Sequence, residues 1–129
     1  MIAAVDTVEG VVLVDVEEEA VLGPGSEVPA AEAPHVDLPR VVATAGAGST
    51  LVAVVDRRPP LAISNDAGAT WREAGGGLPA GFAVAVAEDD PDRMLYAARN
   101  RLYVSTNGGV FWRSLSFELP DVTAVAWID

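Results

Sequence analysis

The sequence contains no cysteine and no lysine, a single histidine, and no long uninterrupted apolar run. Without cysteine there is no disulfide, no thiolate metal site and no cysteine nucleophile. A conventional membrane-spanning helix needs about 18 or more consecutive apolar residues, so we expect no membrane association. The N-terminus also lacks a basic stretch followed by an apolar one, and we therefore expect a cytoplasmic protein without a signal peptide.

Positive charge is scarce as well. The eight basic residues are all arginines, 19 residues are acidic, and the net charge is −11. Nucleic acid is a poor partner for such a surface, because phosphate binding needs a concentrated basic patch. Half of the 129 residues are apolar, which is enough for a sizeable core in one unit.

The chain contains an internal repeat with an offset of 41 residues, which covers the segments 61–71 and 102–112 and continues beyond them. The matched pairs are Ser64 and Ser105, Gly68 and Gly109, Trp71 and Trp112, Pro79 and Pro120, and Val84 and Val125. Self-similarity at a fixed period of this length is typical of proteins built from repeated supersecondary units.

Within one period, short apolar segments separated by turn residues predict four strands, so we expect an all-β fold. In the C-terminal repeat they are 82–87, 93–98, 102–106 and 110–114; in the preceding repeat 40–45, 51–56, 61–64 and 70–73. Three further strands are expected at 2–6, 11–15 and 20–22, and one at 122–127. Prolines at 24, 29, 34 and 39 argue against a helix between them.

These strands predict one domain over residues 1–129 with three four-stranded units, one of which is split between the chain ends. The first unit has its strands within residues 1–22 and is completed by a C-terminal strand at 121–129. A linker at 23–39, the second unit at 40–78 and the third unit at 79–120 account for the remainder.

The string Ser64-x-Asp66-x-Gly68-x-Thr70-Trp71 resembles the Asp-box, or BNR-repeat, motif of β-propellers such as sialidases, sortilin-like ectodomains and photosystem-assembly-factor-like proteins. A second copy has Ser105, Asn107, Gly109 and Trp112, with Asn in place of Asp and Phe111 in place of Thr. The resemblance implies that each unit is a propeller blade whose third and fourth strands are joined by this turn. A short acceptor side chain there collects backbone N–H groups while glycine adopts a left-handed conformation, so we interpret the motif as structural.

Three blades are too few for a closed propeller, which typically has about 4 to 8. We therefore predict a homodimer in which the C-terminal strand of each chain completes the N-terminal blade of the other, giving six blades without an open sheet edge. A trimer with nine blades is the alternative.

Four arginines are candidate ligand-binding residues. Arg57, Arg58, Arg99 and Arg101 lie in the hairpin after the second strand of successive blades, so they are expected to share one face, where forked guanidinium groups suit an anion. The alternative is that they are exposed and balance acidic neighbours. Tyr96 and Tyr103 lie in expected strands without a partner motif for a tyrosine nucleophile.

The acidic turn at 88–92 has oxygen ligands suited to calcium but lacks the spacing of a dedicated loop, so we interpret it as a solvated turn. Residues 17–19, three glutamates at the position of a degenerate motif turn, are expected to face water. His35 alone is weak evidence for acid–base chemistry. We expect no catalytic residues, no metal and no cofactor.

The leading hypothesis is a non-enzymatic propeller that binds a protein, a glycan or a small ligand on one face or in its central opening. The resemblance also leaves open a sialidase-like glycoside hydrolase or glycan-binding protein with a site at the dimer axis, and an assembly factor. Fold alone does not decide among them.

Overall fold

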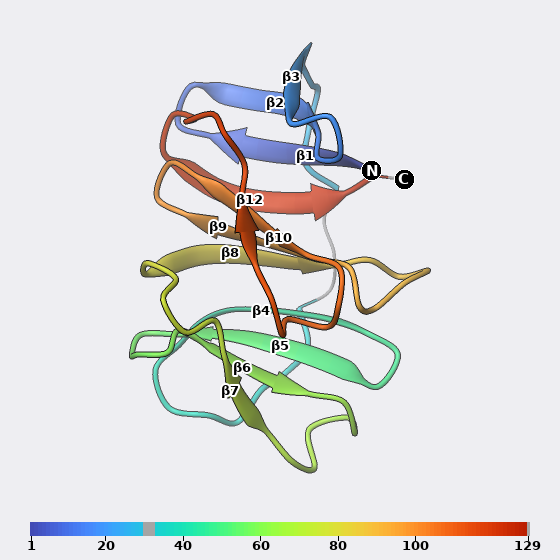
Figure 1. The fold of residues 1–129 in the computed structure, drawn as a ribbon, viewed down its shortest axis with the longest axis vertical. Helices are drawn as coiled ribbons and strands as arrows, with labels where there is room; N and C mark the ends of the chain where they lie inside the picture. Colours follow the sequence, from blue (N-terminus) through green and yellow to red (C-terminus); the bar gives the residue numbers. More distant parts are fainter. Residues whose placement is uncertain (30–32, 129) are drawn as a thin grey trace.

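The computed structural model describes residues 1–29 and 33–128, and these contain strands and turns but no helix (Figure 1). No helix in this part of the chain is therefore long and apolar enough to cross a membrane. The strands are β1 Ile2–Thr7, β2 Gly10–Asp15, β3 Ala20–Pro24, β4 Val41–Ala47, β5 Thr50–Val55, β6 Leu61–Ser64, β7 Arg72–Ala74, β8 Gly81–Val86, β9 Met94–Ala98, β10 Leu102–Ser105, β11 Arg113–Ser114 and β12 Val122–Trp127.

The strands form three four-stranded antiparallel sheets, as the sequence predicts. The first sheet has the order β12-β1-β2-β3, the second β4-β5-β6-β7 and the third β11-β10-β9-β8. The fourth strands begin later than expected, at Arg72 and Arg113, because the turn motif extends further. Val110 and Phe111, placed in a strand from the sequence, lie in this turn and are exposed.

The first sheet is completed within one chain. β12 pairs with β1 of the same molecule, with Ala3 opposite Trp127 and Val5 opposite Val125. The N–H of Ile128 also donates to the carbonyl of Ile2 at 3.0 Å. In this structure the C-terminal strand completes the first sheet of its own chain, so the expected exchange of this strand between two chains is not needed to complete the sheet.

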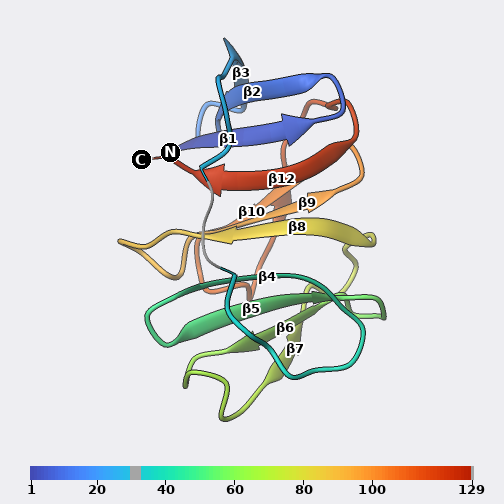
Figure 2. The same cartoon turned by 180° about the vertical axis from the view of Figure 1, so that it is seen from behind.

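The third sheet lies between the other two (Figures 1 and 2). Its inner strand β8 contacts β12 on one side and β4 on the other, whereas no strand of the first sheet contacts a strand of the second in the described part of the chain. The result is an arc with β12, β8 and β4 along its inner side. This arrangement is consistent with consecutive blades of a β-propeller.

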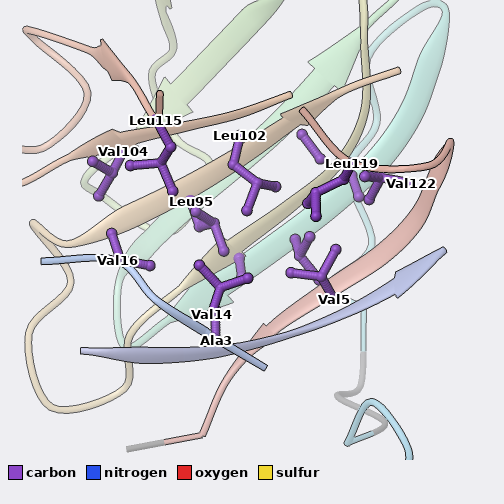
Figure 3. Close-up of a cluster of buried hydrophobic side chains, with 14 residues drawn as sticks. Ala3, Val5, Val14, Val16, Leu95, Leu102, Val104, Leu115, Leu119 and Val122 are labelled. Carbon is purple, nitrogen blue, oxygen red and sulfur yellow. The ribbon is translucent and has the colours of Figure 1, made fainter. Parts of the chain in front are cut away.

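The third sheet is apolar on both faces because it packs on both sides. Successive strand residues point to opposite faces. Ala83 and Ala85 of β8 and Leu95 of β9 therefore pack against the first sheet, in a cluster that includes Ala3 and Val5 (Figure 3). The intervening residues pack against the second sheet: Val84, Val86, Met94 and Tyr96.

The far face of the second sheet is covered by the linker. Val36 and Leu38 pack on Ala53, Val55 and Ala62, each of which is buried, and the flanking residues 35, 37 and 39 are exposed. The linker thus runs as an extended segment with alternating inward and outward side chains. The end of the arc at this sheet is already partly closed to solvent.

Each inner strand carries a register irregularity near its start, at Val42, Phe82 and Thr123. All three side chains are exposed, with Val42 and Phe82 about half accessible at 48% and 49%. A bulge turns one side chain out of the regular alternation. The repeat therefore reproduces a local backbone feature as well as the strand order.

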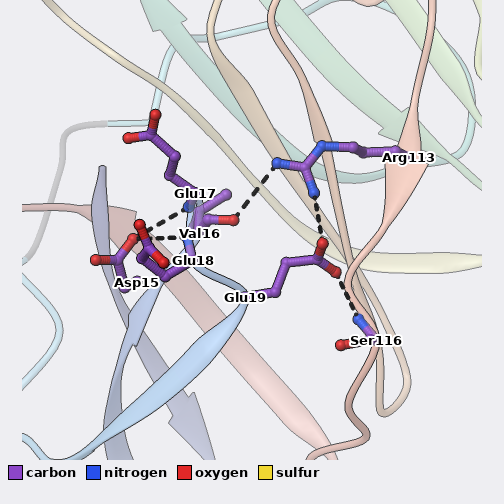
Figure 4. A network of polar contacts seen from close by, with 7 residues as sticks. All are labelled: Asp15, Val16, Glu17, Glu18, Glu19, Arg113 and Ser116. Carbon is purple, nitrogen blue, oxygen red and sulfur yellow. Dashed lines mark hydrogen bonds and ion pairs between the residues drawn. The ribbon is translucent and has the colours of Figure 1, made fainter.

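The acidic turn 16–19 between β2 and β3 corrects one expectation. Glu19 is only partly exposed and is engaged within the chain: its carboxylate pairs with Arg113 of the third sheet at 3.3 Å and accepts the Ser116 N–H at 2.9 Å (Figure 4). Arg113 also donates to the carbonyl of Val16 at 3.5 Å. Glu17 and Glu18 are exposed as expected, and their N–H groups donate to Asp15.

Replacing Glu19 tests this link between the first and third sheets. Glu19→Ala removes the partner of Arg113 and of the Ser116 N–H, so we expect the free energy of unfolding to fall by about 1 to 2 kcal/mol in denaturant titrations. Glu18→Ala is the matched control, since Glu18 is exposed, and it should change the unfolding free energy by less than about 0.5 kcal/mol. Equal effects of the two substitutions would contradict the assigned role of Glu19.

Candidate ligand-binding site

A trough of about 960 Å³ runs along the inner strands of all three sheets. Its walls are residues 44–46 of β4, residues 84–86 of β8, and residues 124–128 in and after β12. Pro29 and Ala33 of the linker and Glu88 and Asp89 of the loop after β8 complete the lining. The trough exists because the inner strands present alanine, glycine, valine and threonine, whose short side chains leave space between the sheets.

One end of the trough carries its charged and aromatic groups. The guanidinium carbon of Arg93 lies 4.6 Å from the centroid of the Trp127 ring, and Arg93 pairs with Asp89 at 3.4 Å. Glu88 and Asp89 are exposed beside this cation–π pair. The indole N–H of Trp127 is buried and donates to no acceptor among the described residues. This end therefore brings an indole ring, a guanidinium group and two carboxylates into one neighbourhood.

The turn motif residues hold the connection between β6 and β7. Ser64 Oγ donates to Asp66 Oδ1 at 2.7 Å and accepts the Gly68 N–H at 2.8 Å. Asp66 in turn accepts the N–H of Thr70 at 2.8 Å and its hydroxyl. These hydrogen bonds, led by the Thr70 hydroxyl, lower the pKa of Asp66 from 3.8 to about 2.

The second copy repeats this geometry without the charge. Ser105 Oγ donates to Asn107 Oδ1 at 3.0 Å and accepts the Gly109 N–H at 2.9 Å, and Asn107 Oδ1 accepts the Phe111 N–H at 3.0 Å. Gly109 has a φ of +83°, and an added Cβ would lie 2.4 Å from Ile63 Cδ1, so glycine is required. The same groups make backbone hydrogen bonds in both turns, which leaves them little freedom for chemistry.

The two motif tryptophans are partly buried. Trp112 donates from Nε1 to the Gly109 carbonyl at 3.0 Å and packs edge-to-face on Tyr96, with ring centroids 6.0 Å apart. Trp71 packs on the covered far face of the second sheet. Both therefore stabilise sheets near the turn, and neither lines the trough.

The four candidate arginines lie in the hairpins β5–β6 and β9–β10. Arg99 pairs with Asp121 at 3.1 Å and Arg101 pairs with Glu118 at 3.1 Å. For Arg57 and Arg58 no hydrogen bond or ion pair exists within residues 1–29 and 33–128. Arg58 lines a separate, smaller pocket of about 320 Å³. The trough lies elsewhere and includes none of these arginines.

The remaining candidate groups do not assemble into a reactive site. Tyr96 is fully buried, donates its hydroxyl to the Pro79 carbonyl, and has its pKa raised by burial. Tyr103 packs edge-to-face on it, with centroids 6.1 Å apart. His35 is exposed in the linker. Among the described residues, no group of three or more His, Asp or Glu side chains is arranged to hold a metal ion.

Trp127 and Arg93 are site residues that the sequence reasoning missed. In the 41-residue repeat, Trp127 of β12 corresponds to Val86 of β8. A tryptophan therefore stands where the inner strand of the preceding repeat has valine. This departure from the repeat, a large aromatic residue on an inner strand, could have identified Trp127 from the sequence. Its partnership with Arg93 could not be found in this way, because it depends on the packing of β12 beside β8.

No protein-family model matches the chain, and no curated protein matches it. Among solved structures, the GH74 enzyme of Niastella koreensis is similar over 94% of this chain, with 26% sequence identity and a TM-score of 0.53. That enzyme belongs to a β-propeller type of glycoside hydrolase, which agrees with a propeller-like arrangement of the three sheets. The chain spans 18% of the length of the enzyme.

The low pKa of Asp66 predicts a specific acid response. Because its pKa in the folded state lies below the ordinary value, its contribution to stability is complete above pH 3.8 and is lost as the pH falls toward about 2. Asp66→Asn, whose side chain fits the same turn at Asn107, should be less stable than the parent at neutral pH, and the difference should shrink across this window.

Denaturant titrations at a series of pH values measure this difference. Asp37→Asn is the control, since Asp37 is exposed in the linker and has no hydrogen bond in the described part of the chain. A stability difference for Asp66→Asn that stays constant from neutral pH to about 2 would show that the charge of Asp66 contributes nothing.

Proposed function

We propose that this protein binds an uncharged glycan in the trough along β4, β8 and β12, without catalysing a reaction on it. The observation that carries the proposal is the end of the trough where Trp127 stands beside the carboxylates of Glu88 and Asp89. The apolar face of a sugar ring stacks on an indole, and sugar hydroxyls donate hydrogen bonds to carboxylates. The volume of about 960 Å³ lies at the upper end of ordinary ligand sites and suits an oligosaccharide.

The negative charge of the protein favours an uncharged ligand. The chain has a net charge of −11, and the carboxylates of Glu88 and Asp89, the second of which is paired with Arg93, stand at the same end of the trough. Both would repel a sialic acid or a uronic acid approaching this end. The similarity to a glycoside hydrolase is compatible with glycan recognition but covers only 18% of that enzyme.

Glycoside hydrolysis is the second candidate function. It requires two carboxyl groups on opposite sides of the scissile bond, separated by about 5 to 10 Å. Along the trough, the glutamate and aspartate residues of the lining are Glu88 and Asp89, which are neighbours on one loop, and Asp89 is paired with Arg93. Among residues 1–29 and 33–128, the acids of the lining therefore stand on one side only, and we favour binding over catalysis.

We further propose that two copies associate as a homodimer and enclose the trough between two arcs. Support comes from the first and second sheets, which stand at the two ends of the arc without contacting each other. The face of the first sheet that points away from the third carries Ala4, Leu13 and Ala126, which are paired across three strands. The far face of the second sheet would meet it through the linker that covers this face, whose outward residues are 35, 37 and 39. Six sheets are within the normal range for a closed ring.

Calorimetric titration with neutral oligosaccharides of several linkages tests glycan binding. We expect saturable binding that Glu88→Ala weakens by about tenfold, since a hydrogen bond to a charged group is lost. Glu73→Ala, at an exposed glutamate on β7 outside the trough, is the matched control and should leave the affinity unchanged. If Glu88→Ala leaves the affinity unchanged, the glycan does not bind at this end of the trough. Release of shorter sugars during the titration would favour hydrolysis.

Light scattering on the eluting protein tests the homodimer. We expect a mass about twice the 13.4 kDa of one chain. Leu13→Glu should shift the protein to the single-chain mass, because it places a charge in the proposed interface. Val8→Glu is the control, at a residue 68% exposed in the β1–β2 hairpin, and should leave the mass unchanged. A parent protein that elutes with the mass of one chain contradicts the dimer while leaving the trough open to test.

A further inference from the structure

The junction between the second and third sheets shows how a neighbouring sheet covers the turn motif. Ile63 of β6 lies so close to the turn of the third sheet that a Cβ added to Gly109 would be 2.4 Å from Ile63 Cδ1. Arg72 of β7 donates to the carbonyl of Gly108 in the same turn. Gly108 and Gly109 are therefore buried.

The turn of the second sheet has the same conformation but no neighbouring sheet. Ala67 and Gly68 correspond to Gly108 and Gly109, and φ is 58° and 94° in this turn against 74° and 83° in the other. Ala67 is exposed and Gly68 is partly exposed. The Ala67 carbonyl accepts no hydrogen bond from the described residues. The second sheet thus carries an uncovered copy of a surface that is buried at the internal junction.

The first sheet has the matching surface. In each sheet, one row of residues paired across all four strands faces the next sheet along the arc. The row of the second sheet is Ala45, Val52, Ile63 and Arg72. The row of the third sheet is Ala85, Leu95, Val104 and Arg113. The corresponding row of the first sheet is Ala126, Ala4, Leu13 and Gly23.

This third row faces the open end of the arc, because the residues that alternate with it pack against the third sheet. Leu13 holds the position that Ile63 has at the internal junction, and it is partly exposed. The row ends in glycine where the other two have arginine, so an apolar contact through Leu13 is what this face offers.

The linker completes the surface on the second sheet. Directly beside the row of the third sheet, the paired Tyr96 and Tyr103 fill the face that meets the second sheet. Their counterparts in the second sheet are the paired Ala53 and Ala62, which are covered by the linker. Apolar linker side chains therefore take the volume that two tyrosine rings fill in the third sheet, and Trp71 packs beside them.

We propose that the two copies of the homodimer join at these surfaces, with Leu13 of one copy seated on the turn 64–71 of the other. The first sheet of one copy then stacks on the linker and Trp71 of its partner. This inference rests on the proposed homodimer and adds which residues meet. The two surfaces lie at opposite ends of the arc, so one chain cannot join them by itself (Figure 1). Two copies form two identical junctions, each of which repeats the packing inside the chain.

Light scattering over a dilution series compares two substitutions in the turn. Ala67→Glu places a charge where the corresponding residue is buried at the internal junction, so we expect it to weaken dimerisation at least about tenfold. Ala69→Glu is the matched control and should leave dimerisation unchanged, because its counterpart Val110 stays 74% exposed beside the formed internal junction. Both alanines are exposed in one chain, so both variants should unfold like the parent.

Chemical cross-linking gives an independent measurement, since the chain has no cysteine of its own. Leu13→Cys combined with Ala67→Cys, treated with a short bismaleimide, should give chain-to-chain links between these two positions in peptide maps. Val8→Cys combined with Ala67→Cys is the control, at a residue 68% exposed in the β1–β2 hairpin, and should give none.

The outcomes separate this junction from the homodimer itself. A parent protein with the mass of one chain overturns both. A dimeric parent that responds equally to Ala67→Glu and Ala69→Glu, or whose cross-links do not join positions 13 and 67, overturns the junction and leaves the homodimer standing.

Discussion

The pairing of β12 with β1 is the contact on which the rest of this structure depends. It joins the two ends of the described chain, with Ala3 opposite Trp127 and Val5 opposite Val125, and it supplies the inner strand that the first sheet lacks. Without β12, β1 would be an unpaired edge, and β8 would lose its neighbour on one side. The same strand forms one wall of the trough and brings Trp127 to Arg93. The candidate site therefore depends on the same strand pairing that completes the first sheet.

The candidate ligand-binding residues are found where the sequence departs from the repeat, whereas the repeated residues are structural. The matched turn residues Ser64 and Ser105 make the same backbone hydrogen bonds in two sheets. Trp127 stands out because its counterpart differs: valine occupies the matching position of the third sheet. In an array of similar sheets, the conserved geometry stabilises each unit, and an unmatched side chain is free to serve a ligand.

Much of the fold followed from the order of residues. Alternating apolar positions and turn residues predict twelve strands, and the offset of 41 residues groups them into three sheets with β12 completing the first. The fourth strands were less well placed, since Val110 and Phe111 are apolar but belong to a turn held by Asn107. Apolar character alone does not distinguish a short edge strand from an exposed turn, because both are defined by backbone hydrogen bonds.

The sequence by itself determined the strand order, the split first sheet and the turn motif, because these depend on local periodicity and on residues that fix backbone conformation. Only the tertiary structure decided that β12 pairs within its own chain, that Glu19 reaches Arg113, and that Arg93 covers Trp127. It also showed the linker on the second sheet through Val36 and Leu38. Such contacts join residues far apart in the chain, and their choice of partner is set by how three sheets pack, which no local pattern encodes.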